Sequence, residues 1–202
     1  MTENIAIPIL AFLVGAMPTA YLAGRLVGGV DIRTVGTGNA GALNSYRQLG
    51  KTAGLGVMAI DTAKGDLVLV IGMAMGADDV ALYVSSVLAA LGHNFSPFTG
   101  FRGGKGGATV LGISMLMAWH ITLIAVGIGA IVYLVRRNSV LALTALFIAL
   151  NALTAGTGQG TGLIVTCLVL SVIVAGTHVL RTYKNFVPSV KQGDWRAALE
   201  RE

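Results

Sequence analysis

The stretch TGLIVTCLVLSVIVAGTHVL, residues 161–180, is a run of 20 residues without a single Asp, Glu, Lys or Arg. Its length matches the roughly 20 apolar residues that one α-helix needs to cross the hydrocarbon core of a bilayer. Six further hydrophobic runs precede it, at residues 5–27, 53–76, 80–98, 107–119, 120–135 and 140–154. The sequence therefore predicts an all-α integral membrane protein, a single polytopic bundle of about seven transmembrane helices joined by glycine-rich cytoplasmic loops.

The overall composition agrees with a membrane protein. Hydrophobic residues make up 54% of the 202 residues, charged residues only 11%, and the mean hydropathy is +0.77, whereas soluble domains carry about 25% charged residues. Several runs are shorter than a full crossing, which indicates short or broken helices. We expect a membrane domain at residues 1–185, its first run a retained helix and not a signal peptide, and a short polar cytoplasmic tail at 186–202. The lone Cys167 excludes a disulfide framework.

The positive charges predict the orientation of the bundle. With seven crossings, all loops that follow odd-numbered helices share one side, and all 14 Lys and Arg residues can be placed on or near that side. The positive-inside rule then makes this face cytoplasmic, with the N-terminus outside and the C-terminus inside. The formal charge of +5 thus reflects orientation and an anionic substrate or membrane lipid, and no feature indicates nucleic acid.

Two glycine-rich, basic segments interrupt the hydrophobic pattern, GTGNAGALNSYR (36–47) and RGGKGGAT (102–109), both on the predicted cytoplasmic side. Glycines expose backbone N–H groups to an anion, and Lys or Arg supplies positive charge. Lys105 is flanked by glycines, and a helix beginning at Gly107 would point its N-terminus at the same anion. Asn39, Asn44 and Arg47 add amides and a guanidinium that suit hydroxyls and phosphate. Two anion cradles suit a substrate with two phosphates, or two phosphorylated substrates.

Three familiar motifs do not account for these segments. Residues 36–41 satisfy G-x-G-x-x-G with Asp61 placed 20 residues beyond, but the preceding run has membrane-spanning length and no strand–helix alternation follows. The segment around Lys105 lacks both the first glycine and the Ser or Thr of a P-loop. His93 lacks the aspartate of the H-x-x-x-x-D motif of soluble acyltransferases, because Phe98 stands there. Nucleotide binding is therefore not expected.

The long motifs DIRTVGTGNAGALNSYRQLGKTAG (31–54), DTAKG (61–65) and GHNFSPFTGFRGGKGGAT (92–109) resemble the bacterial acyl-phosphate:glycerol-3-phosphate acyltransferases, the PlsY family. The likeness extends over nearly the whole chain. It implies a seven-helix enzyme of the bacterial cytoplasmic (inner) membrane. Such an enzyme transfers a fatty acyl group from acyl phosphate to the 1-hydroxyl of glycerol 3-phosphate, giving lysophosphatidic acid and phosphate in phospholipid biosynthesis. It also implies no CoA or acyl-carrier protein as direct donor, no cofactor and no metal.

The resemblance also assigns residues by position. Phosphate and substrate binding falls to Thr37, Gly38, Asn39, Gly41, Asn44 and Arg47 in the first loop, and to Gly103, Gly104, Lys105 and Gly106 in the second. Ser139 and Asn185 match a family serine and asparagine, and the catalytic candidates are Lys105, Arg47, Asn185, Ser139 and His93. Asp61 and Lys64 lie three residues apart on one helix face; they either neutralise one another or belong to the substrate site.

The chain departs from the family pattern at positions that bear on the acceptor. Leu43 stands where the family usually has Thr, and Thr182 stands where it has a histidine, with His178 one turn earlier. Two alternatives to the acyltransferase therefore remain at this point. One is a transporter for a small phosphorylated anion, motivated by Asp61 and Lys64; the other is a non-catalytic binder of such anions or of lipid head groups.

Overall fold

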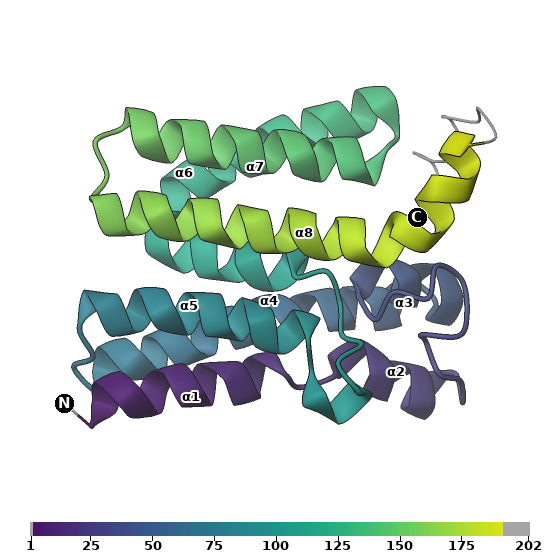
Figure 1. Ribbon diagram of the computed structural model, residues 1–202, viewed down its shortest axis with the longest axis horizontal. Helices are drawn as coiled ribbons and strands as arrows, with labels where there is room; N and C mark the ends of the chain where they lie inside the picture. The colour runs from purple at the N-terminus through teal and green to yellow at the C-terminus, as the bar shows by residue number, and fades with distance from the viewer. Residues whose placement is uncertain (1, 192–202) are drawn as a thin grey trace.

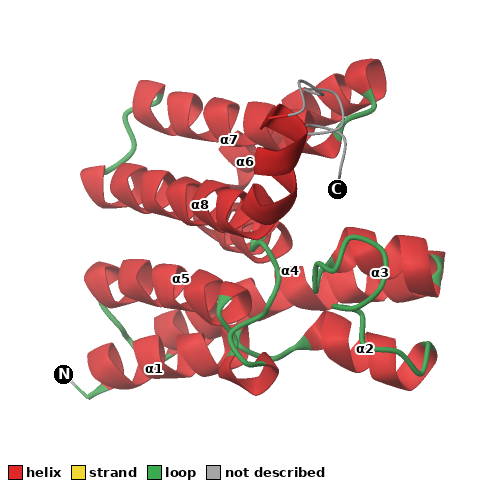
Figure 2. Cartoon of the chain, turned by 45° about the vertical axis from the view of Figure 1, so that its right-hand side comes forward, coloured by secondary structure: helices red, strands yellow, loops and turns green. Residues whose placement is uncertain are grey.

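The computed structural model describes the backbone of residues 2–191 and the side chains of residues 2–182. These residues form helices only: α1 (Glu3–Gly15), α2 (Thr19–Val27), α3 (Ala42–Leu49), α4 (Lys51–Ala74), α5 (Asp79–Asn94), the 3-10 helix η1 (Pro97–Thr99), α6 (Gly107–Arg136), α7 (Ser139–Gly156) and α8 (Thr161–Lys191). Figure 2 shows no strand in the described part of the chain. Four stretches are long and apolar enough to span a membrane by themselves: Glu3–Val27, Gly107–Arg136, Ser139–Gly156 and Thr161–Thr182. The predicted fold class is confirmed.

Helix α6 folds back on itself at Ala118, whose φ of −151° and ψ of 57° are not helical. A straight helix would separate Gly107 from Gly129 by about 33 Å, at 1.5 Å per residue. Yet Gly107 lies against Leu143 and Gly129 against Leu146, less than one turn apart on α7. The runs predicted at residues 107–119 and 120–135 are therefore two passes. Together with α1 plus α2, α4, α5, α7 and α8 they complete the seven-pass bundle.

The first predicted run is also broken, into α1 and α2, at the sequence Met17–Pro18. The break removes helical partners from nearby carbonyl groups, which are costly to leave unpaired at membrane depth. Ser96 Oγ donates to Ala16 O (2.5 Å), and Lys64 Nζ donates to Met17 O (3.0 Å). Polar side chains of α4 and of the segment after α5 therefore stabilise the break.

Small residues set the closest helix contacts. Helix α1 packs along α5, where Gly15 lies against the Ala89 carbonyl and Gly92 against the Phe12 carbonyl, with no room for a Cβ atom at either glycine. Glycine at such positions lets membrane helices approach closely. Larger buried side chains, including Leu69, Ile113, Leu150 and Leu170, fill the core between the remaining helices.

Both glycine-rich segments lie at the same end of the bundle, together with α2, α3 and the C-terminal part of α8 (Figure 1). The N-terminus of α1 and the turn between α7 and α8 lie at the opposite end (Figure 1). The predicted convergence of the two segments is therefore confirmed. Helix α8 continues through residue 185 to Lys191, and the rest of the predicted tail, residues 192–202, lies outside the described residues.

Candidate active site

The first glycine-rich loop is folded around the buried amide of Asn44, in the first turn of α3. Asn44 Nδ2 lies within hydrogen-bond distance of three loop carbonyls, those of Ile32 (2.9 Å), Val35 (3.1 Å) and Asn39 (3.1 Å). Its Oδ1 accepts from the Thr37 N–H (3.1 Å). Asn44 lines the cavity described below, in agreement with its predicted place in the site. However, its amide is already hydrogen-bonded to the loop backbone. Its role is to shape the loop that presents Thr37 and Asn39.

The second glycine-rich loop packs tightly on the end of α5. The N–H groups of Gly103 and Gly104 donate to the carbonyls of Asn94 and His93, both at 3.2 Å. A Cβ atom at Gly103 would lie 1.9 Å from the His93 carbonyl oxygen, and one at Gly104 would lie 2.1 Å from His93 Nε2. These two glycines therefore permit close packing and direct their N–H groups to α5. Of this loop, Lys105 and Gly106 line the cavity described below.

The N-terminus of α6 opens on the site next to Lys105. Gly106 precedes the helix with a φ of +85°, a left-handed conformation that favours glycine. Gly106, Gly107 and Ala108 all line the cavity described below. The first N–H groups of a helix have no intrahelical acceptor and carry partial positive charge. Lys105 and the first turn of α6 therefore form one electropositive wall.

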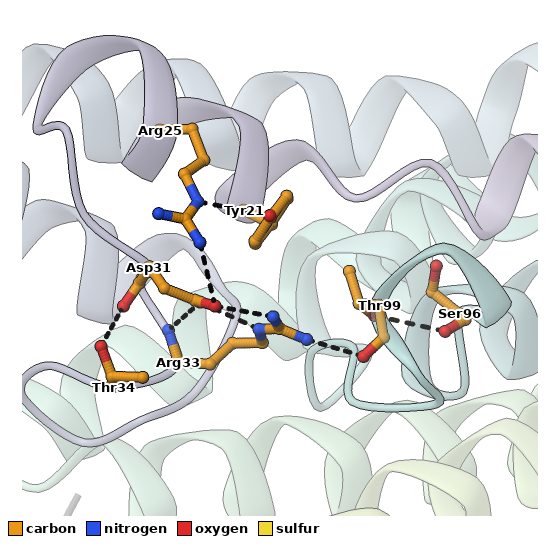
Figure 3. A network of polar contacts seen from close by, with 7 residues as sticks. All are labelled: Tyr21, Arg25, Asp31, Arg33, Thr34, Ser96 and Thr99. Carbon is orange, nitrogen blue, oxygen red and sulfur yellow. Dashed lines mark hydrogen bonds and ion pairs between the residues drawn. The ribbon is translucent and has the colours of Figure 1, made fainter.

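A polar network outside the cavity joins the two loops (Figure 3). Arg33 donates to both carboxylate oxygens of Asp31 (Nε 2.9 Å, Nη2 2.6 Å) and through Nη1 to the Thr99 carbonyl (2.7 Å) in η1. Its guanidinium lies 4.8 Å from the ring centroid of Tyr21, and Arg25 flanks the same ring at 5.3 Å. The hydrogen bonds from Arg33 lower the pKa of Asp31 to about 2. This contact between separate segments was not predicted, although Asp31 and Arg33 lie two residues apart in the first motif.

A cavity of about 390 Å³ lies between the two loops. Its polar lining comprises Thr37, Asn39, Asn44, Asp61, His93, Lys105 and Ser139, with Gly41 and Gly106. Its apolar lining comprises Leu43, Leu55, Met58, Leu111, Leu143, Leu146 and Phe147. Most predicted site residues are therefore brought together, from the two glycine-rich loops and from α3, α4, α5 and α7. The lining suits an amphiphile with an anionic head group and an apolar chain.

Asp61 and Lys64 form a buried ion pair at the base of the site. Lys64 Nζ lies 2.9 Å from Asp61 Oδ1, although no aligned hydrogen bond from the described residues reaches this oxygen. The ring nitrogen His93 Nδ1 lies 3.7 Å from the same oxygen. Because Lys64 also donates to Met17 O, the pair links the break between α1 and α2 to His93. This contact explains the intramembrane charges without a transport pathway.

The remaining predicted residues lie outside the cavity lining. Gly38 lies in the first loop, and the exposed Arg47 lies in α3. Gly103 and Gly104 pack against His93, and Lys64 pairs with Asp61, so these three residues contact residues that line the cavity. Neither Thr182 nor His178 lines the cavity, and the Thr182 hydroxyl donates to the His178 carbonyl within α8. The side chain of Asn185 lies outside the described residues. No group of three or more His, Cys, Asp or Glu side chains is placed to hold a metal ion in the described part of the chain.

A helical bundle that spans the membrane several times, with an amphiphile-shaped cavity beside an electropositive helix end, defines a polytopic membrane protein that handles phosphorylated lipids. The profile of the family described as "Glycerol-3-phosphate acyltransferase" matches residues 5–187, and the chain belongs to this family. It is 38% identical over 177 residues to glycerol-3-phosphate acyltransferase 4 of Dehalococcoides mccartyi, covering 88% of this chain and 96% of that protein. It is also 38% identical over 173 residues to the glycerol-3-phosphate acyltransferase of a Synechococcus strain, covering 83% of each.

Two solved structures have the same fold. They are crystal structures of PlsY, an integral membrane glycerol 3-phosphate acyltransferase, in its glycerol 3-phosphate form and its lysophosphatidic acid form. The TM-scores are 0.83 and 0.81, with 28% and 27% identity, and each match covers 95% of this chain and 93% of the other. The resemblance stated from the motifs is confirmed.

Proposed function

We propose that this chain transfers a fatty acyl group from acyl phosphate to the 1-hydroxyl of sn-glycerol 3-phosphate, in the cavity between the two glycine-rich loops. The products are lysophosphatidic acid and inorganic phosphate. The observation that carries the site assignment is the meeting of Lys105, the first turn of α6 and the first loop around one cavity that also has a long apolar lining. Both substrates carry phosphate, and the donor and the product also carry a fatty chain.

The chemistry requires little beyond orientation and charge neutralisation. The acceptor oxygen attacks the acyl carbon, a new ester C–O bond forms, and the bond from that carbon to the phosphate oxygen breaks. Acyl phosphate is a mixed anhydride with a good leaving group. Holding the reactants together supplies much of the rate, and positive groups stabilise the developing negative charge. A phosphate oxygen of a substrate accepts the hydroxyl proton, so that no protein base is required.

The cavity lining suggests a role for each group. Lys105 and the N–H groups that begin α6 offset phosphate charge at one wall. Thr37 and Asn39 present a hydroxyl and an amide from the first loop, and Ser139 adds a hydroxyl from the start of α7. Leu143 and Phe147 continue the α7 wall into the apolar region, where a fatty chain fits. The polar lining therefore orients the acyl-phosphate group of the donor, while the apolar lining holds its fatty chain.

The orientation in the membrane is part of this proposal. The end of the bundle that holds Arg25, Arg33, Arg47, Lys105 and Arg136 is the basic one, which the positive-inside rule places in the cytoplasm. Water-soluble glycerol 3-phosphate then enters from the cytoplasm, and the acyl chain lies in the adjoining leaflet.

The direct test is an acceptor screen with the purified protein, acyl phosphate and mass spectrometry of the lipid products. We expect lysophosphatidic acid and phosphate in equal amounts with glycerol 3-phosphate, and no new lipid with glycerol or with buffer alone. A different acylated acceptor would overturn the assigned acceptor. Accumulation of labelled glycerol 3-phosphate in proteoliposomes without any acylation would replace the enzyme by a transporter.

A further inference from the structure

Arg181, in the C-terminal part of α8, carries a positive charge that has no carboxylate partner among residues 2–182. Its Nη2 donates to the carbonyls of Asn94 (2.7 Å) and Phe101 (3.4 Å). Its Nε is buried and has no hydrogen-bond acceptor among the described atoms. The carboxylate–cation pairs within residues 2–182 join Asp31 and Asp61 to other partners and do not include Arg181. Partly buried charges are normally paired, because desolvation penalises an isolated ion.

A second arginine increases this local excess of positive charge. Arg102 follows Phe101, whose carbonyl Arg181 contacts, and the charges of the two guanidinium groups repel one another. The side chain of Arg102 is exposed, and within the described residues it takes part in no hydrogen bond or ion pair. Two neighbouring cations without an acidic partner create a positive potential that an anion would relieve.

The arginine pair lies outside the catalytic cavity. Neither arginine lines that cavity. Arg181 donates to the Asn94 carbonyl, which also accepts from the Gly103 N–H, whereas Lys105 lines the cavity. A phosphate bound between the two arginines is therefore separate from the substrate phosphates.

Exposed apolar side chains surround the pair. Phe98 and Phe101 in the loop before Arg102 are 62% and 63% exposed, and Val179 and Leu180 beside Arg181 are 59% and 69% exposed. Exposed apolar patches of this kind mark sites of contact with a membrane or a partner. The surface therefore offers two cations next to an apolar face, which matches an anionic lipid in charge and in amphiphilic character.

We propose that Arg102 and Arg181 bind the phosphate of an anionic phospholipid from the surrounding leaflet, at a site distinct from the catalytic cavity. The guanidinium groups of Arg102 and Arg181 supply charge-assisted hydrogen bonds to phosphate oxygens. The acyl chains lie along Phe101 and the exposed face of α8. The site does not depend on the proposed reaction, because it uses none of the residues assigned to that reaction.

Phosphatidylglycerol is the probe, titrated into the full-length protein in neutral detergent, with bound lipid counted by native mass spectrometry. We expect Arg102→Gln to weaken binding about tenfold, as loss of one charge-assisted hydrogen bond predicts. The matched control Arg136→Gln, an exposed arginine at the same end of the bundle, should change it less than about twofold. Arg181→Gln should weaken binding as well. Arg102→Gln tests the site even if Arg181→Gln folds poorly, because the Arg102 side chain is exposed and makes no hydrogen bond or ion pair within the described residues.

Three results would overturn the proposal. The first is unchanged phosphatidylglycerol binding by a folded Arg102→Gln variant. The second is displacement of the lipid by glycerol 3-phosphate, or its loss in Lys105→Ala, which would place the lipid in the catalytic cavity. The third is equal binding of inorganic phosphate or of phosphatidylcholine, which would show a free-anion site or a purely apolar contact. Acyl transfer by the wild-type protein is measured separately, so failure here leaves the proposed reaction intact.

Discussion

Asn44 is the residue whose replacement tests the architecture of the site most specifically. Its amide has hydrogen-bond partners at four backbone groups of the first loop, and each such bond contributes about 1 kcal/mol net. The two N–H bonds of the Asn44 amide are shared among the three carbonyls, so the amide makes the equivalent of about three hydrogen bonds, and Asn44→Ala removes about 2–3 kcal/mol from the folded loop once water reaches the freed groups. If this loop conformation is required to bind the acceptor, kcat/KM for glycerol 3-phosphate should fall about 30- to 140-fold, at 1.4 kcal/mol per tenfold.

The variant Asn44→Asp sharpens this test. It keeps an oxygen for the Thr37 N–H but replaces the NH₂ donor, which faces the carbonyls of Ile32, Val35 and Asn39, by a second oxygen. The assay is phosphate release from acyl phosphate at varied glycerol 3-phosphate, alongside thermal unfolding in detergent. We expect Asn44→Asp to be at least as inactive as Asn44→Ala. Activity of Asn44→Asp within about threefold of wild type would refute the assignment of the amide as the organiser of the loop.

Three further perturbations follow from the same contacts. Gly104→Ala places a methyl group against His93 Nε2 and should abolish most activity, whereas Gly56→Ala, with open space around it, should not; comparable rates for the two variants would contradict the packing described for the second loop. The hydrogen bonds from Arg33 lower the pKa of Asp31 from its ordinary 3.8 to about 2. Its tie to Arg33 is therefore fully present above about pH 4 and weakens as the pH falls toward 2. Unfolding temperature measured against pH should show this loss in wild type and in Asp79→Asn but not in Asp31→Asn. Asp61→Asn leaves the buried Lys64 ammonium unpaired and should destabilise the fold by about 3–5 kcal/mol. The double variant Asp61→Asn/Lys64→Met should recover part of this loss in thermal unfolding, and additive effects would argue against the ion pair.

The seven passes were predictable because each membrane-spanning helix requires a long run of apolar residues, and all seven predicted runs correspond to helices. The breaks within the helices were harder to predict from the sequence. Pro18 gave a local signal for the break between α1 and α2, but the return of the chain at Ala118 has neither Gly nor Pro at the turn and was anticipated only from run length. Helix α3 was missed because Asn44 and Ser45 are poor helix formers in water, and it forms inside the bundle through tertiary contacts.

The sequence predicted which segments form the site, but it did not predict what each residue of those segments does. Glycine content combined with Arg47 in the first segment and Lys105 in the second identified both loops. However, spacing alone does not distinguish a glycine that offers its N–H to an anion from Gly103 and Gly104, which direct theirs to α5. The contributions of Asp31, Arg33 and Tyr21 depend on contacts between separate segments (Figure 3), which the close spacing of Asp31 and Arg33 in the sequence does not by itself reveal.

The central claim is that Lys105 and the helix end beside it hold substrate phosphate in this cavity. The most direct measurement compares kcat/KM for acyl transfer to glycerol 3-phosphate in Lys105→Ala with that in Lys51→Ala, an exposed lysine at the same end of the bundle. We predict a loss of about 100-fold or more for Lys105→Ala, as for other charged groups that contact a transition state, and less than about twofold for Lys51→Ala. Equal rates in a folded Lys105→Ala variant would contradict the account.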